Sequence, residues 1–317
     1  MDVKQLKALV TVAEVGSVTR AAELLHLVQP AVTRQIRTLE QELGIPLFER
    51  TRQGMRPTEA GTVMVDRARR ALNELERARV ELQPTPGVVT GLVTVGLLES
   101  TTALLAEPLV SVIAQNHPGI ELRLMTGYSG HLQQWLDEGD LDLTLLYNLP
   151  STPSLNAQPL VQESLWAVAP PLDALSPDRP VPFEEVSTHP LVMPAAGHAL
   201  RTLVDEAAAR AKSKVNAVVQ TNSMWVQKQL VQAGYGWTIL PAAGIAADVA
   251  RGELSAAPLC EPDVYRSVVL GTQRAGRTPP AVEVVVRELT HLINTAVRQW
   301  RWPSAQLPEN GADVRHE

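Results

Sequence analysis

Cysteine is almost absent from this sequence, and long apolar runs are missing altogether. The single cysteine among 317 residues, Cys260, excludes an internal disulfide framework and fits a reducing cytoplasm. An apolar-flanked cysteine is usually a small core residue, and a redox sensor is the alternative. No apolar stretch reaches the roughly 20 residues of a membrane span. We therefore expect a cytoplasmic protein that does not bind a membrane.

Motifs of the common enzyme classes are missing as well. The sequence has no G-x-S-x-G elbow, Walker loop, GxGxxG after a strand, H-E-x-x-H or CxxC. Its seven histidines show no metal-ligand spacing. We therefore expect neither an enzyme nor a bound metal or cofactor.

Charge is unevenly distributed along the chain. Residues 1–82 hold 13 Lys and Arg against 11 Asp and Glu, whereas residues 83–317 hold 15 against 23. Only the N-terminal part therefore suits a polyanion such as DNA. Because its positive excess is small, binding depends on where the cations lie rather than on their number.

The N-terminal residues have the pattern of a helix-turn-helix. Apolar spacing predicts a first helix over residues 3–15, which Gly16 ends. Ser17 is a good cap for a second helix over residues 19–25. A third helix is predicted for residues 29–43, with Pro30 in its first turn and a buried stripe formed by Val32, Ile36, Leu39 and Leu43.

A basic hairpin and a long helix follow. Residues 47–57 predict a wing, and this order of elements places one helix in the major groove of DNA with a basic loop beside it. Thr58 is expected to cap a helix of about 25 residues, roughly 37 Å long. Its apolar stripe predicts a coiled-coil dimerisation arm, and packing on its own domain is the alternative; the stripe is Val65, Ala68, Leu72, Leu75 and Leu82.

Beyond the Pro84–Gly87 hinge the pattern changes to short β-branched strands that alternate with helices. This β-α-β order predicts parallel sheets covered by helices, arranged as two α/β lobes joined by crossing strands. The fold class is therefore α+β: a winged helix-turn-helix, a linker helix, and a two-lobed α/β domain. Predicted boundaries are 1–58 for the winged domain, 59–83 for the linker, 84–90 for the hinge, 91–302 for the two-lobed domain (lobe I 91–162 and 267–302, lobe II 163–266) and 303–317 for a disordered tail.

With these residues in view, the chain resembles the LysR-type transcriptional regulators over essentially its full length. The specific part is AAELLHLVQPAVTRQIRTLEQELGIPLFERTRQGMRPTEAG, with its paired alanines, its QPAxxxQI register, LGxxLFxR and T-E-A-G. The resemblance implies a linker-helix dimer, a homotetramer built from two dimers, an effector domain of the periplasmic-binding-protein type, and contact with RNA polymerase. One residue departs from the pattern: Val28 stands where the family commonly has a capping Ser or Thr. A missing cap costs about 1 kcal/mol, unless Gln29 or a water satisfies the free N–H groups.

Several polar residues of the third helix and the wing are candidates for contact with double-stranded promoter DNA. Arg34 has the reach for the O6 and N7 atoms of a guanine, and Arg37 is better placed for phosphate. Arg20 and Arg56 are either contacts or plain surface residues. A dimer of such heads predicts an interrupted inverted repeat with half-sites about one helical turn apart. The predicted DNA contacts are Gln29, Pro30, Thr33, Arg34, Arg37, Arg50, Arg52 and Gln53.

Polar residues after three predicted strands, and at the start of one helix, are candidates for a small-molecule effector site. Such strand ends and helix starts offer hydroxyls and free N–H groups, which suits a small organic anion if Arg201 or His198 supplies charge. Each Ser or Thr is alternatively a plain helix cap, Arg201 alternatively pairs with Asp205, and Glu99 favours a cationic or hydroxyl-bearing ligand. The predicted contacts are Ser100, Thr101, Thr102, Thr126, Tyr128, Ser129, His198, Arg201, Thr221 and Asn222.

The sequence therefore predicts a DNA-binding regulator that responds to a small effector. The alternative function is a solute-binding sensor without DNA regulation, since the two lobes alone would fit it. The helix-turn-helix and the lack of a secretion signal argue against that alternative.

Overall fold

The computed structural model describes residues 1–51, 54–82, 88–149, 155–274 and 278–308. The chain divides into two compact units, Met1–Pro86 and Gly87–Glu317. Among the described residues, no helix is both long enough and apolar enough to cross a membrane. The predicted contacts Arg52 and Gln53 lie outside the described residues, as does most of the predicted hinge.

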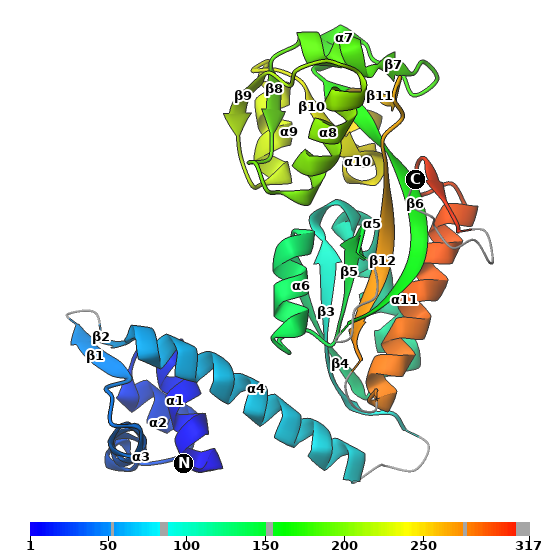
Figure 1. Cartoon of the computed structure of the whole chain (residues 1–317). Coiled ribbons are helices and arrows are strands. Elements are labelled where there is room, and N and C mark those ends of the chain that lie inside the picture. Colours follow the sequence, from blue (N-terminus) through cyan, green and yellow to red (C-terminus); the bar gives the residue numbers. More distant parts are fainter. Residues whose placement is uncertain (52–53, 83–87, 150–154, 275–277, 309–317) are drawn as a thin grey trace. The chain divides into compact units, whose positions relative to one another are not determined.

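The first unit is a helical head with a two-stranded wing (Figure 1). Its core is formed by apolar side chains of every helix and of the wing, among them Leu9, Val32, Leu39 and Phe48. Its elements are α1 (Val3–Val15), α2 (Val18–Leu24), α3 (Gln29–Leu43), β1 (Phe48–Thr51), β2 (Gly54–Pro57) and α4 (Glu59–Leu82).

Local sequence signals set most of these boundaries. The Ser17 hydroxyl accepts a hydrogen bond from the backbone N–H of Arg20, so the predicted cap of α2 is confirmed. Helix α3 has the predicted bounds, and Gly44 ends it in the left-handed conformation. The predicted stripe is wrong at its end, because Leu43 is 44% exposed. Leu43 is the last residue of α3, and the core residues of that helix are Val32, Ile36 and Leu39.

Glycines let the wing approach the helices closely. A Cβ on Gly54, whose φ is +125°, would lie 2.3 Å from the Gly16 carbonyl oxygen. The neighbouring Met55 N–H donates to that same oxygen at 2.8 Å. A Cβ on Gly61 would lie 1.9 Å from the Leu47 carbonyl oxygen. These contacts fix the wing beside the helix-turn-helix, because any larger residue would push the backbones apart.

The first part of α4 packs on its own domain. Val65 and Ala68 are 4% and 1% exposed within the core of the head, and Leu72 packs against that core. Leu75 is 51% exposed. The first half of the apolar stripe of α4 therefore packs within the head, which was the alternative to a dimerisation arm. For the half that begins at Leu75, the dimerisation arm stays a prediction.

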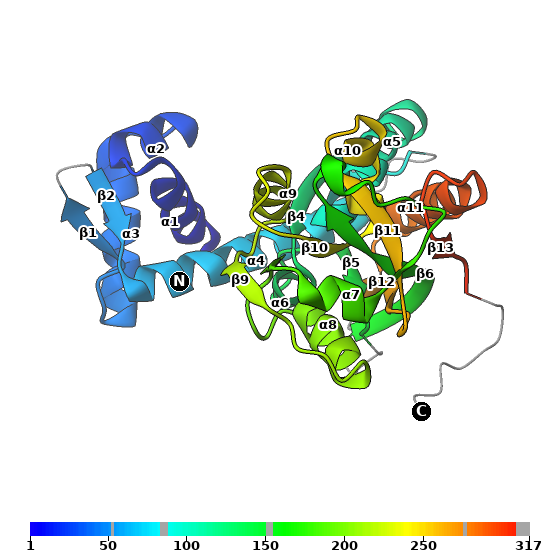
Figure 2. The same cartoon turned by 90° about the horizontal axis from the view of Figure 1, so that it is seen from above.

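The second unit contains two lobes joined by two long strands, β6 (Leu155–Ala169) and β12 (Tyr265–Gln273) (Figures 1 and 2). The larger sheet has the order β4-β3-β5-β12-β6-β11-β7, and β10 and β13 also pair with β6. Strand β3 lies parallel to β4 and β5, as a β-α-β order requires, and β12 is antiparallel to its neighbours β5 and β6.

Each lobe has its own core. Strand β6 contributes Val161 to the core of lobe I and Leu165 to that of lobe II. The other elements of lobe I are β3 (Gly91–Leu98), α5 (Glu99–Asn116), β4 (Ile120–Gly127), α6 (Ser129–Asp137), β5 (Leu143–Tyr147), α11 (Pro280–Arg298) and β13 (Ala305–Gln306). Those of lobe II are η1 (Pro171–Asp173), β7 (Val181–Pro182), α7 (Phe183–Thr188), β8 (Leu191–Met193), α8 (Ala199–Arg210), β9 (Ala217–Gln220), α9 (Met224–Gln232), β10 (Thr238–Pro241), η2 (Ala242–Gly244), α10 (Ala246–Ala250) and β11 (Ser255–Cys260).

The beginning of the predicted disordered tail is ordered. Trp302 is 1% exposed and belongs to the core of lobe I. Ala305 and Gln306 form β13 and pair with Glu163 and Gln162 of β6. The prediction of disorder from residue 303 is therefore wrong for residues 303–308, and the remainder lies outside the described residues.

Candidate DNA interface and effector site

The predicted DNA-contacting residues of α3 lie on one side of the helix, away from the core of the head. Gln29, Pro30, Arg34 and Arg37 are exposed and Thr33 is partly exposed, whereas Val32, Ile36 and Leu39 are buried. We call Gln29, Pro30, Thr33, Arg34 and Arg37 the recognition face. The Gln29 amide donates to the Thr33 hydroxyl at 2.9 Å, and that hydroxyl donates to the Gln29 carbonyl oxygen at 3.1 Å.

Within the described part of the chain, the arginines of this face have no carboxylate partner. Among the described residues, Arg34, Arg37 and the wing residue Arg50 form no ion pair. Arg20 and Arg56 are also exposed. Exposed guanidinium groups without partners are free to bind phosphate oxygens or the acceptor edge of a guanine.

The N-terminus of α3 has no side-chain cap, as the sequence predicts from Val28. The Gln29 amide is bonded to Thr33 and no bond from it to the first turn is found. The backbone instead reduces the free-energy cost of the missing cap. Pro30 has no N–H that needs a partner, and the Ala31 N–H donates to the Val28 carbonyl oxygen at 2.9 Å. Only the N–H of Gln29 then lacks a partner within the first three residues of the helix.

The predicted effector residues lie partly at the contact between the two lobes of the second unit. Tyr128 of lobe I and His198 of lobe II stack edge to face, with ring centroids 4.3 Å apart. A Cβ on Gly244 would lie 3.2 Å from Ser100 Cβ and 2.8 Å from Met224 Sδ. We call the following residues the lobe junction: Glu99, Ser100, Tyr128, Glu163, His198, Met224, Trp225, Gly244 and Arg266.

A buried ion pair joins the two crossing strands at the junction. Arg266 and Glu163 are 4% and 0% exposed in their side chains, and 2.6 Å separates Arg266 Nη2 from Glu163 Oε1. The Arg266 guanidinium also donates to the Ser100 hydroxyl at 2.7 Å. Trp302 donates its indole N–H to the other Glu163 oxygen at 2.8 Å. The pair therefore ties the two strands, α5 and the C-terminal segment together.

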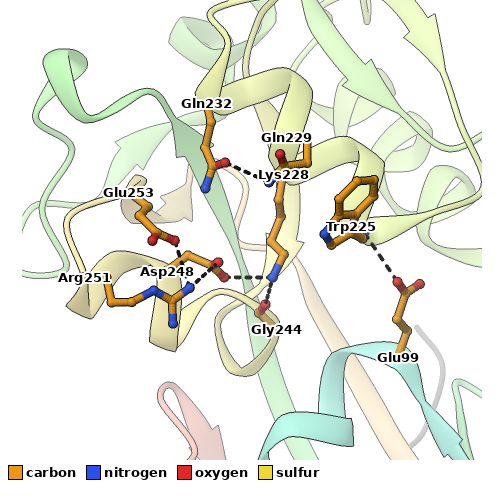
Figure 3. A network of polar contacts seen from close by, with 9 residues as sticks. All are labelled: Glu99, Trp225, Lys228, Gln229, Gln232, Gly244, Asp248, Arg251 and Glu253. Carbon is orange, nitrogen blue, oxygen red and sulfur yellow. Dashed lines mark hydrogen bonds and ion pairs between the residues drawn. The ribbon is translucent and has the colours of Figure 1, made fainter.

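Glu99 is the second polar link between the lobes. Its carboxylate accepts hydrogen bonds from the backbone N–H groups of Met224, at 3.3 Å, and Trp225, at 3.4 Å, at the start of α9. Figure 3 shows Glu99 reaching α9 beside the ion-pair cluster of lobe II. In that cluster Lys228 donates to Asp248 at 2.8 Å and to the Gly244 carbonyl oxygen at 3.4 Å. Lys228 thus holds Gly244 close to α9.

Two polar atoms at the junction are buried without a hydrogen bond: Tyr128 Oη and His198 Nε2. The Tyr128 hydroxyl nevertheless lies within reach of the Glu99 carboxylate, and burial together with this carboxylate raises the pKa of Tyr128 well above its usual range. Burial, with the neighbouring charges of His131 and Arg266, lowers the pKa of His198 to about 4. Because His198 Nδ1 accepts a hydrogen bond from the Leu200 N–H, the neutral imidazole carries its proton on Nε2.

The other predicted effector residues divide into two groups. Thr102, Thr126, Thr221 and Asn222 are exposed or partly exposed. Thr101 is a correction, because it is 0% exposed and its hydroxyl donates to the Leu98 carbonyl oxygen, so it offers no surface to a ligand. Ser129 is 3% exposed, and its hydroxyl accepts from the Tyr147 N–H.

Arg201, the predicted cation of the site, is paired. Its Nε lies 2.8 Å from Asp205 Oδ1, and its Nη1 donates to the Pro194 carbonyl oxygen at 3.4 Å. The alternative of an i,i+4 pair is therefore confirmed. Arg266 and Glu163 were missed, because 103 residues separate them and no local motif connects them. Cys260 ends β11 partly exposed, and burial with nearby acidic residues raises its pKa, which disfavours a reactive thiolate.

Comparison with known proteins identifies both units. A family model described as a bacterial regulatory helix-turn-helix protein of the lysR family matches residues 3–62, and one described as a LysR substrate binding domain matches residues 86–293. The HTH-type transcriptional regulator BbuR of Bordetella bronchiseptica is 30% identical over 303 residues, which are 96% of this chain and 93% of that protein. The nitrogen assimilation regulatory protein nac of Klebsiella aerogenes is 29% identical over 297 residues, 93% of this chain and 96% of that protein.

Solved structures share the fold over the full chain. Full-length CbnR in complex with its target DNA has a TM-score of 0.70 at 21% identity, covering 92% of this chain and 100% of that one. A full-length OxyR variant from Pseudomonas aeruginosa has a TM-score of 0.69 at 21% identity, covering 99% of each chain.

Proposed function

Because this chain belongs to the LysR family of bacterial transcriptional regulators, we propose that it binds an interrupted inverted repeat in a promoter and responds to a small effector held between its two lobes. It is a DNA-binding regulator rather than an enzyme, and the matched helix-turn-helix excludes a solute-binding sensor without DNA regulation. The relatives named above support a cytoplasmic location, because they are transcriptional regulators.

The recognition face supports the DNA-binding part of the proposal. Gln29 and Thr33 contact base edges, Arg34 binds a guanine and Arg37 binds phosphate. Pro30 lies against the groove, and Arg50, Arg52 and Gln53 of the wing contact the backbone or the minor groove. The exposure of Arg34, and its lack of an ion pair with any described residue, is the observation that carries this assignment.

The proposed domain layout is a reading head over residues 1–58, a linker over 59–83, a hinge over 84–90 and an effector domain over 91–302. The part of α4 from Leu75 onward pairs with a second copy, since Leu75 is an apolar residue that is 51% exposed. Two such dimers form a tetramer, and the promoter-bound assembly contacts RNA polymerase.

Selection from a random duplex library with the full-length protein tests the DNA part. We expect enrichment of an inverted repeat whose half-sites lie about one helical turn apart, and sedimentation as a dimer or tetramer. A monomeric chain that enriches no sequence would refute the proposal.

The effector part rests on the two unpartnered polar atoms at the junction, Tyr128 Oη and His198 Nε2. The proposed contacts are Thr102, Thr126, Tyr128, His198, Thr221 and Asn222; Ser100 is not among them, because it is 6% exposed and its hydroxyl accepts from Arg266. Effector binding shifts the contact between the lobes, and the change passes to the DNA-bound assembly.

A thermal-shift screen of metabolites on the full chain, followed by calorimetry, tests this site. We expect Thr102→Ala and Thr221→Ala to weaken the binding of a metabolite found in that way. Unchanged affinity in both variants would show that the metabolite does not bind at the lobe junction.

A further inference from the structure

The first turn of α9 has all of its N–H groups satisfied, and two of them are satisfied from the other lobe. Ser223 Oγ accepts from the Val226 N–H at 3.3 Å, which is an ordinary cap. The N–H groups of Met224 and Trp225 instead donate to Glu99, which lies 125 and 126 residues earlier in the sequence. Helix N-termini attract anions through such N–H groups and through the helix dipole. Glu99 therefore fills an anion-binding position with a carboxylate of the chain itself.

The positive charges around the junction are compensated as well. Arg201 is paired with Asp205, and Arg266 is paired with Glu163 in a buried position. The His198 imidazole is neutral, because its Nδ1 accepts a backbone hydrogen bond. None of these three groups therefore leaves a positive charge open to an anionic ligand.

Two buried polar atoms of the junction make no well-formed hydrogen bond to the described residues, and they are of another kind. Tyr128 Oη is both donor and acceptor, and His198 Nε2–H is a donor. Their rings are in contact, so a small ligand that separates the two rings would meet both side chains. Glu99 is the charged acceptor beside Tyr128, because its carboxylate lies within reach of the Tyr128 hydroxyl.

We propose that Glu99 occupies, from within the chain, the place where an anionic effector would bind α9, and that the effector is instead an uncharged or cationic polar molecule. Such a molecule donates a hydrogen bond to the Glu99 carboxylate and accepts one from His198 Nε2–H. This inference rests on the proposed effector site between the lobes, and it replaces the organic anion that the sequence predicts. The Glu99 contact also holds the lobes together in the absence of effector.

Hydrogen exchange of the full-length protein at residues 221–226 tests this proposal, with sulfate as the anionic probe. In Glu99→Ala the Met224 and Trp225 amides should exchange about tenfold faster than in the wild type. Sulfate should restore their protection in Glu99→Ala and leave the wild type unchanged. Because exchange is measured at residues 221–226, sulfate bound at α9 is distinguished from sulfate bound to the DNA-binding arginines.

Two controls make the result specific. Glu107→Ala removes an exposed carboxylate from the same helix and should leave exchange at residues 221–226 unchanged. The Val226 amide, bonded within lobe II, should stay protected in every variant. Wild-type exchange in Glu99→Ala, or an absence of sulfate protection there, would overturn the proposal. Neither result bears on DNA binding, so failure here is distinct from failure of the proposed function.

A separate observation concerns Val28, at the start of the recognition helix. Its side chain is 69% exposed and caps nothing. The backbone arrangement at Pro30 and Ala31 makes a capping hydroxyl unnecessary, as described above. Folding of the head therefore gives no reason for an aliphatic side chain at this position.

Recognition of DNA does give a reason for an aliphatic side chain at residue 28. Val28 directly precedes Gln29, whose amide is already bonded to Thr33, so an apolar group borders a preset polar face. The thymine C5-methyl is the apolar feature of the major groove. We infer that Val28 contacts a thymine methyl and selects thymine at one position of each half-site.

Replacing single thymines of the selected operator by deoxyuracil tests this assignment, since only the methyl group is lost. For the wild type we expect about fourfold weaker binding at one position per half-site. In Val28→Ser that substitution should have no effect, whereas Val3→Ser, which alters an exposed valine of α1, should behave as the wild type. A loss that persists in Val28→Ser, or no sensitive thymine in the operator, would contradict the inference. Failure to select any operator would instead count against the proposed function.

Discussion

The arginines of the recognition face and wing have environments opposite to those of the arginines at and around the lobe junction. In the head, Arg34, Arg37 and Arg50 are exposed and form no ion pair among the described residues. In the effector unit, Arg266 and Arg201 each lie against a carboxylate, and Arg266 is buried with its partner. The first arrangement leaves charge available to a polyanion, and the second uses charge to hold the fold together.

The difference separates two uses of the same side chain. An exposed guanidinium contributes little to folding, so its position is explained by what it binds. A buried guanidinium is costly to leave without its partner, so its position is explained by the strands it joins. Substitutions of the exposed recognition-face arginines should therefore affect DNA binding, and substitution of the buried Arg266 should affect stability.

The largest expected effect is at the buried pair. Arg266→Met leaves Glu163 buried without its cation, and should lower the free energy of unfolding of the effector unit by about 3–5 kcal/mol. Denaturant titration measures this loss. Arg287→Met, at a residue whose side chain is 65% exposed, should change stability by less than about 0.5 kcal/mol. Equal stability of the two variants would show that the pair does not hold the lobes.

Arg34→Ala should have the next largest effect, and on DNA binding alone. Losing a bidentate guanine contact should weaken operator binding by about 5–150-fold, and weak salt-sensitive binding to random duplex should remain. Fluorescence anisotropy on both duplexes measures the two affinities. Arg298→Ala, an exposed site in the effector unit, is the matched control. If the Arg34→Ala protein still prefers the operator over random duplex, Arg34 does not read a base.

The head is more predictable from sequence than the junction, for physical reasons. Short-range rules fix its elements: Ser17 caps α2, Gly44 ends α3, and Pro30 fits the first turn. Leu43 was misassigned because periodicity does not reveal where a core ends, and exposure there is set by the tertiary packing.

The junction depends on contacts between distant segments. Strand β6 carries Pro159 in its first half, so local sequence does not mark it as one continuous strand. The structure accommodates that proline at a shift of register between Val268 and Val269 of β12, and such irregularities tolerate a residue without an N–H. The Glu163–Arg266 pair, the link from Glu99 to α9 and the docking of Trp302 likewise join residues more than a hundred positions apart.

Arg50→Ala should have a smaller and less specific effect than Arg34→Ala. Arg50 is assigned to the phosphate backbone of DNA. Its loss should therefore weaken binding to the operator and to random duplex by similar factors, and should reduce the slope of log affinity against log salt by about 1. Salt titrations of the wild type and the variant measure the slope. An unchanged slope would mean that Arg50 does not meet phosphate.

The last expected effect is the pH dependence of stability at His198, which is reduced because this side chain is partly exposed. Its pKa falls from 6.5 to about 4 in the folded chain, so the unfolded chain binds more protons between these values. The contribution of His198 to stability is therefore fully present above pH 6.5 and is lost as the pH falls toward 4. The melting temperature of His198→Asn should fall less steeply in this window than that of the wild type. His291→Asn, at an exposed histidine, should follow the wild type, and identical slopes for all three proteins would contradict the assignment.

The most direct test of the account is the ratio of the affinities of the full-length protein for its selected operator and for a scrambled duplex of equal length, measured at physiological salt. A recognition face whose exposed arginines form no ion pair with described residues predicts a ratio of roughly a thousand or more, with both affinities falling as salt rises. Equal affinities for the two duplexes would contradict the central claim, because the open arginines of the head would then attract DNA without reading it.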